Sequence, residues 1–313
     1  MVSLLTVLAM LLSAPRPAPP PPDAWHGAIL IAPDAPAPSA QALQAALAAL
    51  SSPAQPAAND ARAAPTTLVK PSPDQLRGLG APLLVAVGVP EFGDFLVAYV
   101  ASPRPAEALA EPRKRSLAAI LDDAPLPAHA SQLVVHFYPT TAPRLAAIPA
   151  MRAYVRALAL LADTTRAAAV ALDDVPVVHP ASYFAESVKA GAHSHLAVAL
   201  FIARDHAYYT LSSQGLTRLG RREIDLDTRL GDVGHAITFF YDLVTWLTDR
   251  DTDLAPGETV GRNAAEHLTP TPHTRDGGVL AWRLGIQGPP PPVPPSRAPA
   301  PSPVPSPAPS SPP

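Results

Sequence analysis

The segment His193–Thr228, HSHLAVALFIARDHAYYTLSSQGLTRLGRREIDLDT, decides the fold. It contains two apolar runs, a turn marked by Gly215, and a third run in which polar and apolar residues alternate. Runs of this length, bounded by turn-forming residues, are typical of neighbouring β-strands. The segment therefore predicts three consecutive strands, and their short connections favour antiparallel pairing.

The same signals continue on both sides of this segment. A short connection containing Pro90 and Gly93 joins Leu83–Val89 to Phe95–Ala101, which predicts a β-hairpin. Apolar residues between 151 and 161 recur at helical spacing, and Ser39 can cap a helix that follows it. Further predicted elements are strands at 26–33, 66–71, 131–139, 167–180 and 277–286, helices at 181–192 and 231–251, and a helical segment at 102–130 that Pro112 splits.

These elements follow one another without a regular β-α-β order, and several neighbouring strands are joined by tight turns. This pattern predicts an α+β fold, with a mainly antiparallel mixed sheet packed by helices. We place a single α+β domain at residues 25–286. The order of its elements also suggests two similar ferredoxin-like halves, at 25–130 and 131–286.

The two ends of the chain differ from this domain. The apolar run Leu4–Leu12 would rise only about 14 Å as a helix, too little to cross a bilayer. Residues 1–24 therefore suggest a signal peptide with a Pro-rich spacer, and the protein is periplasmic or secreted if that signal is used and cytoplasmic otherwise. No Lys or Arg precedes the run, so an extra N-terminal element or a misplaced start is the alternative. Residues 287–313 are rich in Pro, Ser and Ala, which predicts a disordered tail.

The composition excludes several classes of protein. The chain has a net charge of −3 and only 16% charged residues, which argues against a nucleic-acid-binding protein. It has no cysteine, which excludes disulfides, thiolate metal sites and cysteine nucleophiles. An apolar content of 48% is ample for a buried core.

Histidines supply the most specific candidate site. His193 and His195 form an H-x-H pair at the predicted start of a strand, where both side chains would share one face. Two-histidine metal sites use this spacing, and His206 or His179 could supply a third ligand. The alternative is that these histidines are structural or solvated. Asp205 beside His206 fits a hairpin turn better than a catalytic pair.

Other motifs are incomplete. The acidic loop 249–260 begins like a calcium-binding loop, but Leu254 and Val260 replace the glycine and the glutamate that such a loop needs. GLTRLG at 215–220 has the spacing of a phosphate-binding loop without its Lys-Ser/Thr. Signatures of common hydrolases are absent from the sequence. The small basic clusters, 113–115 and Arg218 with Arg221 and Arg222, indicate a solvated face or a site for an acidic partner.

Several segments, taken in order, resemble the uncharacterised bacterial family catalogued as domain-of-unknown-function family 4261. They are HGAILIAPDAPAPSAQALQAAL, the ASPRP after the hairpin, HASQLVVHF, AAAVALDDVPVVHPASYF, GLTRLGRREIDLD and GETVG. Together they span roughly residues 26–285. The resemblance implies a compact α+β domain and no established activity, so it assigns no catalytic residues. Its glycines are most simply turn residues.

The sequence thus favours a non-enzymatic binding or accessory module that recognises a protein partner and needs no cofactor. One form of this hypothesis is a protein that binds or neutralises the product of a neighbouring gene. The competing hypothesis is a metal-binding protein or metal-dependent enzyme that uses His193, His195 and His206. The oligomeric state is not encoded in any motif.

Overall fold

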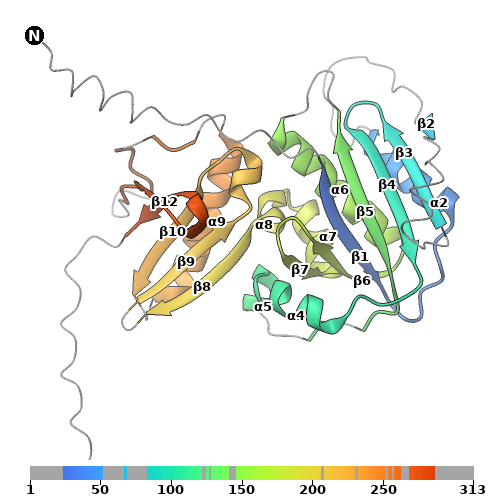
Figure 1. Ribbon diagram of the computed structural model, residues 1–313, viewed down its shortest axis with the longest axis horizontal. Helices are drawn as coiled ribbons and strands as arrows, with labels where there is room; N and C mark the ends of the chain where they lie inside the picture. Colours follow the sequence, from blue (N-terminus) through green and yellow to red (C-terminus); the bar gives the residue numbers. More distant parts are fainter. Residues whose placement is uncertain are drawn as a thin grey trace, which may run out of the picture.

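The computed structural model describes residues 24–51, 67–68, 83–121, 125–126, 128–140, 146–205, 208–229, 232–250, 253–255, 257–261 and 268–285. The predicted signal peptide, apart from Ala24 of its spacer, and the predicted disordered tail lie outside these residues. Two sheets and the helices packed on them make up the described part (Figure 1). The predicted α+β fold is confirmed.

The larger sheet has seven strands in the order β2-β3-β4-β5-β1-β6-β7, and all neighbouring strands are antiparallel. The predicted hairpin forms its β3 and β4 strands. The strand bounds are β1 Trp25–Ile31, β2 Thr67–Leu68, β3 Leu83–Val89, β4 Gly93–Val100, β5 Ser131–Pro139, β6 Ala167–Leu172 and β7 Val177–Pro180.

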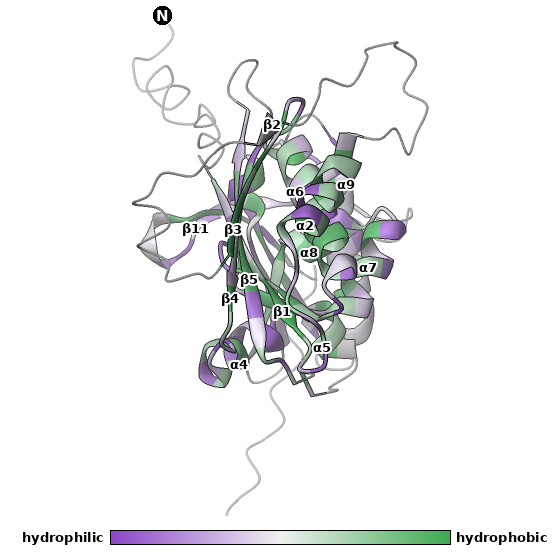
Figure 2. Cartoon of the chain, turned by 90° about the vertical axis from the view of Figure 1, so that its right-hand side faces the viewer, coloured by the Kyte–Doolittle hydropathy of each residue, from purple (hydrophilic) through white to green (hydrophobic). Residues whose placement is uncertain are grey.

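Helices cover one face of this sheet, which we call the inner face (Figure 2). They are α2 (Ala40–Ala48), α6 (Ala147–Thr164) and α7 (Ala181–Lys189). The Oγ of Ser39 accepts a hydrogen bond from the Ala42 amide at 3.1 Å, so the predicted N-cap is confirmed. One face of α6 is fully buried, because the apolar residues between 151 and 161 align on it.

The opposite face, which we call the outward face, is covered at one end by α4 (Ala106–Lys114) and the short α5 (Leu117–Leu121). Both helices contact β7. Leu109 of α4 is buried against the outward side chains of β1, β6 and β7. In Figure 2, α4 lies at the foot of the view, on the side of the sheet opposite α2 and α6.

The second sheet has five strands in the order β11-β12-β10-β9-β8. Its β10–β12 pair is parallel and its other pairs are antiparallel. The 17-residue helix α9 (Val233–Asp249) packs on one face of it. The strand bounds are β8 Ala199–Asp205, β9 Tyr208–Gln214, β10 Glu223–Arg229, β11 Thr271–Thr274 and β12 Leu280–Leu284.

Two expectations are corrected. His193–Ala197 is a short helix, α8, and not the beginning of a strand; the first strand of the opening segment starts at Ala199. Pro112 lies inside α4, and the helical segment breaks after Lys114 instead. Pro112 has no backbone N–H to donate within α4, and the helix ends two residues after it.

Strands from both sides of the suggested boundary between residues 130 and 131 belong to the larger sheet. β5 comes from the second segment, yet it lies between β4 and β1 of the first. The change of sheet instead comes near residue 198, between α8 and β8. None of the described helices has the length and apolar character that a membrane span requires.

Candidate binding face

The outward face carries apolar residues where an exposed sheet normally carries polar ones. In an antiparallel sheet with one solvated face, buried apolar residues alternate with exposed polar residues along each strand. On β3 both alternate sets are apolar, and the outward sets of β4 and β5 combine apolar residues with Asp94, Gln132 and His136. We define the open face as the outward residues Leu84, Ala86, Leu96, Ala98 and Val134.

Register places large and small side chains of the open face side by side. Leu84 pairs with Ala98, and Ala98 pairs on its other side with Val134. Ala86 pairs with Leu96. The three large residues are partly exposed, whereas the two alanines are buried between them. The exposed part of the open face is therefore formed by its three large apolar residues.

A histidine pair borders the open face. His26 of β1 and His136 of β5 are register partners, and their Nδ1 atoms lie 2.6 Å apart. One ring must donate its proton and the other must accept it, so both rings cannot be protonated in this contact. Burial and the nearby charge of His26 lower the pKa of His136, although Asp173 and Asp174 oppose this shift. The pair gives the open face a polar border.

Asp173 and Arg104 extend this border. The Arg104 guanidinium lies 2.6 Å from the Asp173 carboxylate, and both side chains are partly exposed. The ring of His129 lies 3.2 Å from the Arg104 carbonyl oxygen, which fixes the chain just before α4. The ion pair therefore joins the segment before α4 to the end of β6.

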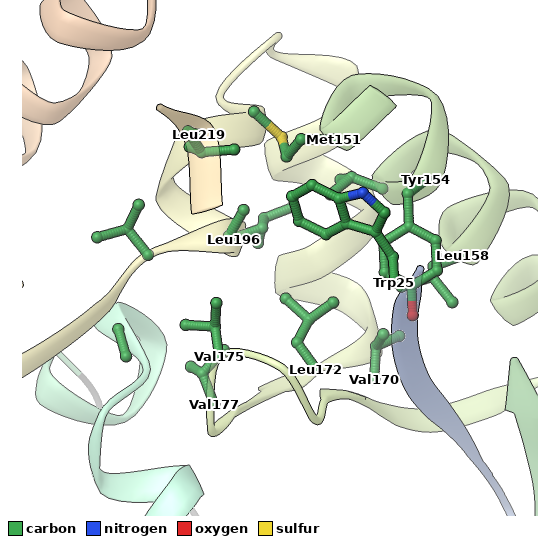
Figure 3. Packing of buried hydrophobic residues seen from close by; sticks show 14 of the residues in the cluster. Trp25, Met151, Tyr154, Leu158, Val170, Leu172, Val175, Val177, Leu196 and Leu219 are labelled. Carbon is green, nitrogen blue, oxygen red and sulfur yellow. The ribbon is translucent and has the colours of Figure 1, made fainter. Parts of the chain in front are cut away.

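A small cavity lies below the same end of the sheet, on the inner face. Its empty space, including solvent at its open side, is about 230 Å³. Its walls include Trp25, Tyr154, Asp174 and Val175. Figure 3 shows the ring of Trp25 beside Tyr154, above Leu172 and Val175. The enclosed part of this space is large enough for about one water molecule, so a drug-sized ligand does not fit in the cavity.

Buried polar atoms surround this cavity without partners in the described part of the chain. They are Trp25 Nε1, Tyr154 Oη and Arg218 Nε. Burial and the charges of Asp174 and Asp173 raise the pKa of Tyr154 well above its ordinary value, so its hydroxyl stays protonated. Other atoms of the Arg218 guanidinium do have partners: the group stacks on Trp25 at 4.8 Å and pairs with Asp174 at 2.8 Å.

The structure does not bring the sequence-predicted histidines to one face. On helix α8 residues two apart point in nearly opposite directions, so His193 and His195 lose the shared face that a strand would give them. His195 Nε2 lies 2.8 Å from Thr245 Oγ1 of α9. Burial lowers the pKa of both histidines. His206 lies outside the described residues, and within them no group of three or more His, Asp or Glu side chains is placed to hold a metal ion.

His179 is a structural residue. It is fully buried on β7, where its Nδ1 lies 2.7 Å from Ser116 Oγ and its Nε2 lies 3.1 Å from the Leu196 carbonyl oxygen. Ser116 is also fully buried, so this Ser–His pair has no access to a substrate. Burial lowers the pKa of His179 to about 4. The pair joins the α4–α5 junction to β7 and α8.

The arginines of the basic cluster in the opening segment contact other parts of the chain. Arg218 contacts β1 and Asp174, as described above. Arg221 donates to the carbonyl oxygens of Leu247 and Arg250 at the end of α9. Arg222 stacks on Trp282 at 4.4 Å. These arginines therefore tie the β9–β10 connection to α9, to β12 and to the larger sheet.

The acidic loop and the glycines of the opening segment are also structural. Asp253 accepts hydrogen bonds from the Arg222 amide and the Trp282 indole, and Glu258 pairs with Arg250 at 2.7 Å. Gly220 ends a short 3-10 helix in the left-handed conformation, with φ 73°. The prediction that this glycine serves a turn is confirmed.

Buried acids of β10 hold the five-stranded sheet together. Glu223 accepts hydrogen bonds from the amides of Gly215 and Thr217, which fixes the turn before it. Asp225 pairs with Arg275 at 2.7 Å and lies 2.7 Å from His273 Nε2. Burial alone would raise the pKa of Asp225, but hydrogen bonds from Arg275 and Ser212 and nearby positive charge bring that pKa below its ordinary value.

Comparisons with protein-family models, with curated proteins and with solved structures gave no match. Sequence reasoning missed the open face, although LLVAVGV and FLVAYVA show apolar residues at both odd and even positions. That absence of alternation was the signal, because it is typical of strands covered on both faces.

Proposed function

We propose that this chain is a non-enzymatic binding module that recognises a protein partner through the open face. The observation that carries the proposal is the presence of Leu84, Leu96 and Val134 at partly exposed positions of an outward sheet face. Contiguous apolar surface on a folded domain marks an interaction site or an aggregation hazard. Membership in the family that the sequence resembles is part of this proposal and adds no activity to it.

The polar clusters support a binding module rather than an enzyme. Ser116 and His179 are buried together, and Asp225 and Glu223 are engaged by arginine or by backbone amides. Each of these groups holds two segments of the chain in place. The partner is proposed to be a protein and not a nucleic acid, because the open face is apolar and carries no cation.

Photo-crosslinking in the native host tests this proposal. A benzophenone amino acid is placed at Leu96 of the open face and, as a matched control, at Ile202, which is 39% exposed on the other sheet. We expect a discrete adduct with another protein at position 96 and not at position 202. Equal labelling at both positions, or no adduct at position 96, would contradict the proposal. So would turnover in a broad hydrolase and transferase panel that one pocket substitution abolishes.

A further inference from the structure

We propose that the occupant of the open face is a single amphipathic helix of the protein partner, lying beside α4. This inference rests on the proposed binding function and specifies what is bound. Four features of the sheet support it: the way α4 already packs, the relief of the open face, its size and its charge.

Helix α4 shows how a helix sits on this face. Its Leu109 is only 2% exposed and packs with Ala28 and Leu30 of β1 and with alanines of β6. Ala28 pairs with Val134 across the β1–β5 ladder, so the floor beneath α4 continues directly into the open face. A second helix placed next to α4 would complete a layer of helices on this side of the sheet.

The arrangement of large and small side chains on the open face suits the side chains of a helix. The alanines at 86 and 98 alternate with Leu84, Leu96 and Val134 in adjacent register positions. Large residues spaced three and four apart on a helix can pack against the partly exposed side chains of Leu84, Leu96 and Val134. An added β-strand would need a free sheet edge instead; β4 and β5 are paired on both sides, and β3 pairs with β2 at Val87 and Gly88.

The size of the open face distinguishes a helix from a second copy of the chain. Three strands spaced about 4.8 Å apart and roughly 20 Å of strand length give an area on the order of 300 Å². A stable dimer buries about 800 Å² on each partner, which is more than the open face offers. A helix about 10 Å wide and about 14 residues long covers it.

Charge on this side of the sheet is confined to its borders. Within the described residues, Asp94 and His136 are the acidic or basic residues at the outward positions of β3, β4 and β5. The pair of Arg104 with Asp173 lies on the side toward α4. The bound helix is therefore expected to present an apolar stripe to the open face and polar residues to solvent.

A displayed peptide library tests the inference. Half of the library encodes 16-residue peptides with apolar residues at helical spacing, and the other half encodes peptides of the same composition with alternating apolar residues. Selection uses the wild-type chain, Leu96→Lys, Val134→Lys and the control Ile202→Lys. Circular dichroism and thermal unfolding establish that each variant is folded before selection.

We expect at least tenfold enrichment of helix-patterned peptides on the wild type and on Ile202→Lys, and loss of that enrichment on both open-face variants. Enrichment of alternating peptides would overturn the helix and leave the binding function standing. Sedimentation velocity of the full chain adds a second readout: a wild-type dimer that Leu96→Lys dissociates would show that a second copy is the occupant. Absence of any peptide enrichment, together with absence of a crosslink at position 96, would overturn the binding function itself.

Discussion

Ser116 Oγ and His179 Nδ1 lie 2.7 Å apart in the interior, and neither side chain is exposed. Because His179 is buried in the neutral form, its pKa falls from an ordinary value of 6.5 to about 4. Between these two pH values, His179 is therefore protonated in the unfolded state and neutral in the folded state.

Acid should destabilise the protein through this histidine. The free energy of unfolding is unaffected by this histidine above pH 6.5 and falls as the pH drops from 6.5 through about 4. The full loss corresponds to about 3 kcal/mol. Urea unfolding at pH 7 and pH 4.5 measures the loss. In His179→Gln, which cannot titrate, the difference between the two pH values should shrink by most of that amount. An unchanged difference would show that His179 does not govern acid stability.

Substitution of Arg275 should lower the free energy of unfolding far more than substitution of Arg283. Arg275→Ala leaves the Asp225 carboxylate buried without its guanidinium, so we expect the free energy of unfolding to fall by about 3 kcal/mol. Arg283 pairs with Asp227 but is 54% exposed, so Arg283→Ala should cost within about 1 kcal/mol. Chemical denaturation of the two variants measures both effects, and equal losses would refute the role assigned to Asp225.

The hydroxyl of Tyr154 should contribute little stability. It is buried and has no partner among the described residues, so Tyr154→Phe removes an unsatisfied polar group while keeping the ring. We expect an unfolding temperature equal to or above that of the wild type. A loss of more than about 1 kcal/mol would show that the hydroxyl is hydrogen-bonded, by a water in the adjacent cavity or by another group.

Gly27 should be intolerant of a side chain. A Cβ atom there would lie 2.5 Å from Tyr154 Oη and 2.6 Å from the Ala171 carbonyl oxygen, so β1 or α6 would have to move. We expect Gly27→Ala to lower the free energy of unfolding by about 2 kcal/mol. Gly234→Ala is the matched control, because a Cβ atom at that position of α9 meets no atom within 4 Å. That control should be neutral or stabilising.

Metal analysis tests the competing hypothesis of a site at His193 and His195. We expect purified, untagged protein to carry less than stoichiometric zinc, because helix α8 directs the two side chains to different sides. Stoichiometric zinc that disappears in a His193→Ala/His195→Ala double variant would establish the metal site. His206 would then be the residue to substitute next.

The fold class followed from patterns that are local in sequence. Alternation and turn residues located the β3–β4 hairpin, and helical spacing located α6, because both signals arise within a single element. The helix α8 was missed because five residues give too short a window for periodicity, and the apolar run of β8 follows it directly.

The candidate site could not be located in the same way, because it depends on partners far apart in the sequence. His26 meets His136 and Arg218 meets Asp174 only after the strands have paired. The H-x-H motif drew attention because its residues are neighbours in sequence, whereas register determines which histidines meet. Arg218, Arg221 and Arg222 looked like a charged surface for the same reason, since nothing local indicated the helix end and the aromatic rings that they contact.

The position of β5 between β4 and β1 has a consequence for synthesis of the chain. β1 is made early, but its two neighbours, β5 and β6, begin about a hundred or more residues later. At translation rates of about 5–20 residues per second, both edges of β1 stay unpaired for at least several seconds. Its apolar run Ile29–Ile31 is therefore the segment that a nascent chain most needs to shield, and stalling before residue 131 should yield an aggregation-prone product.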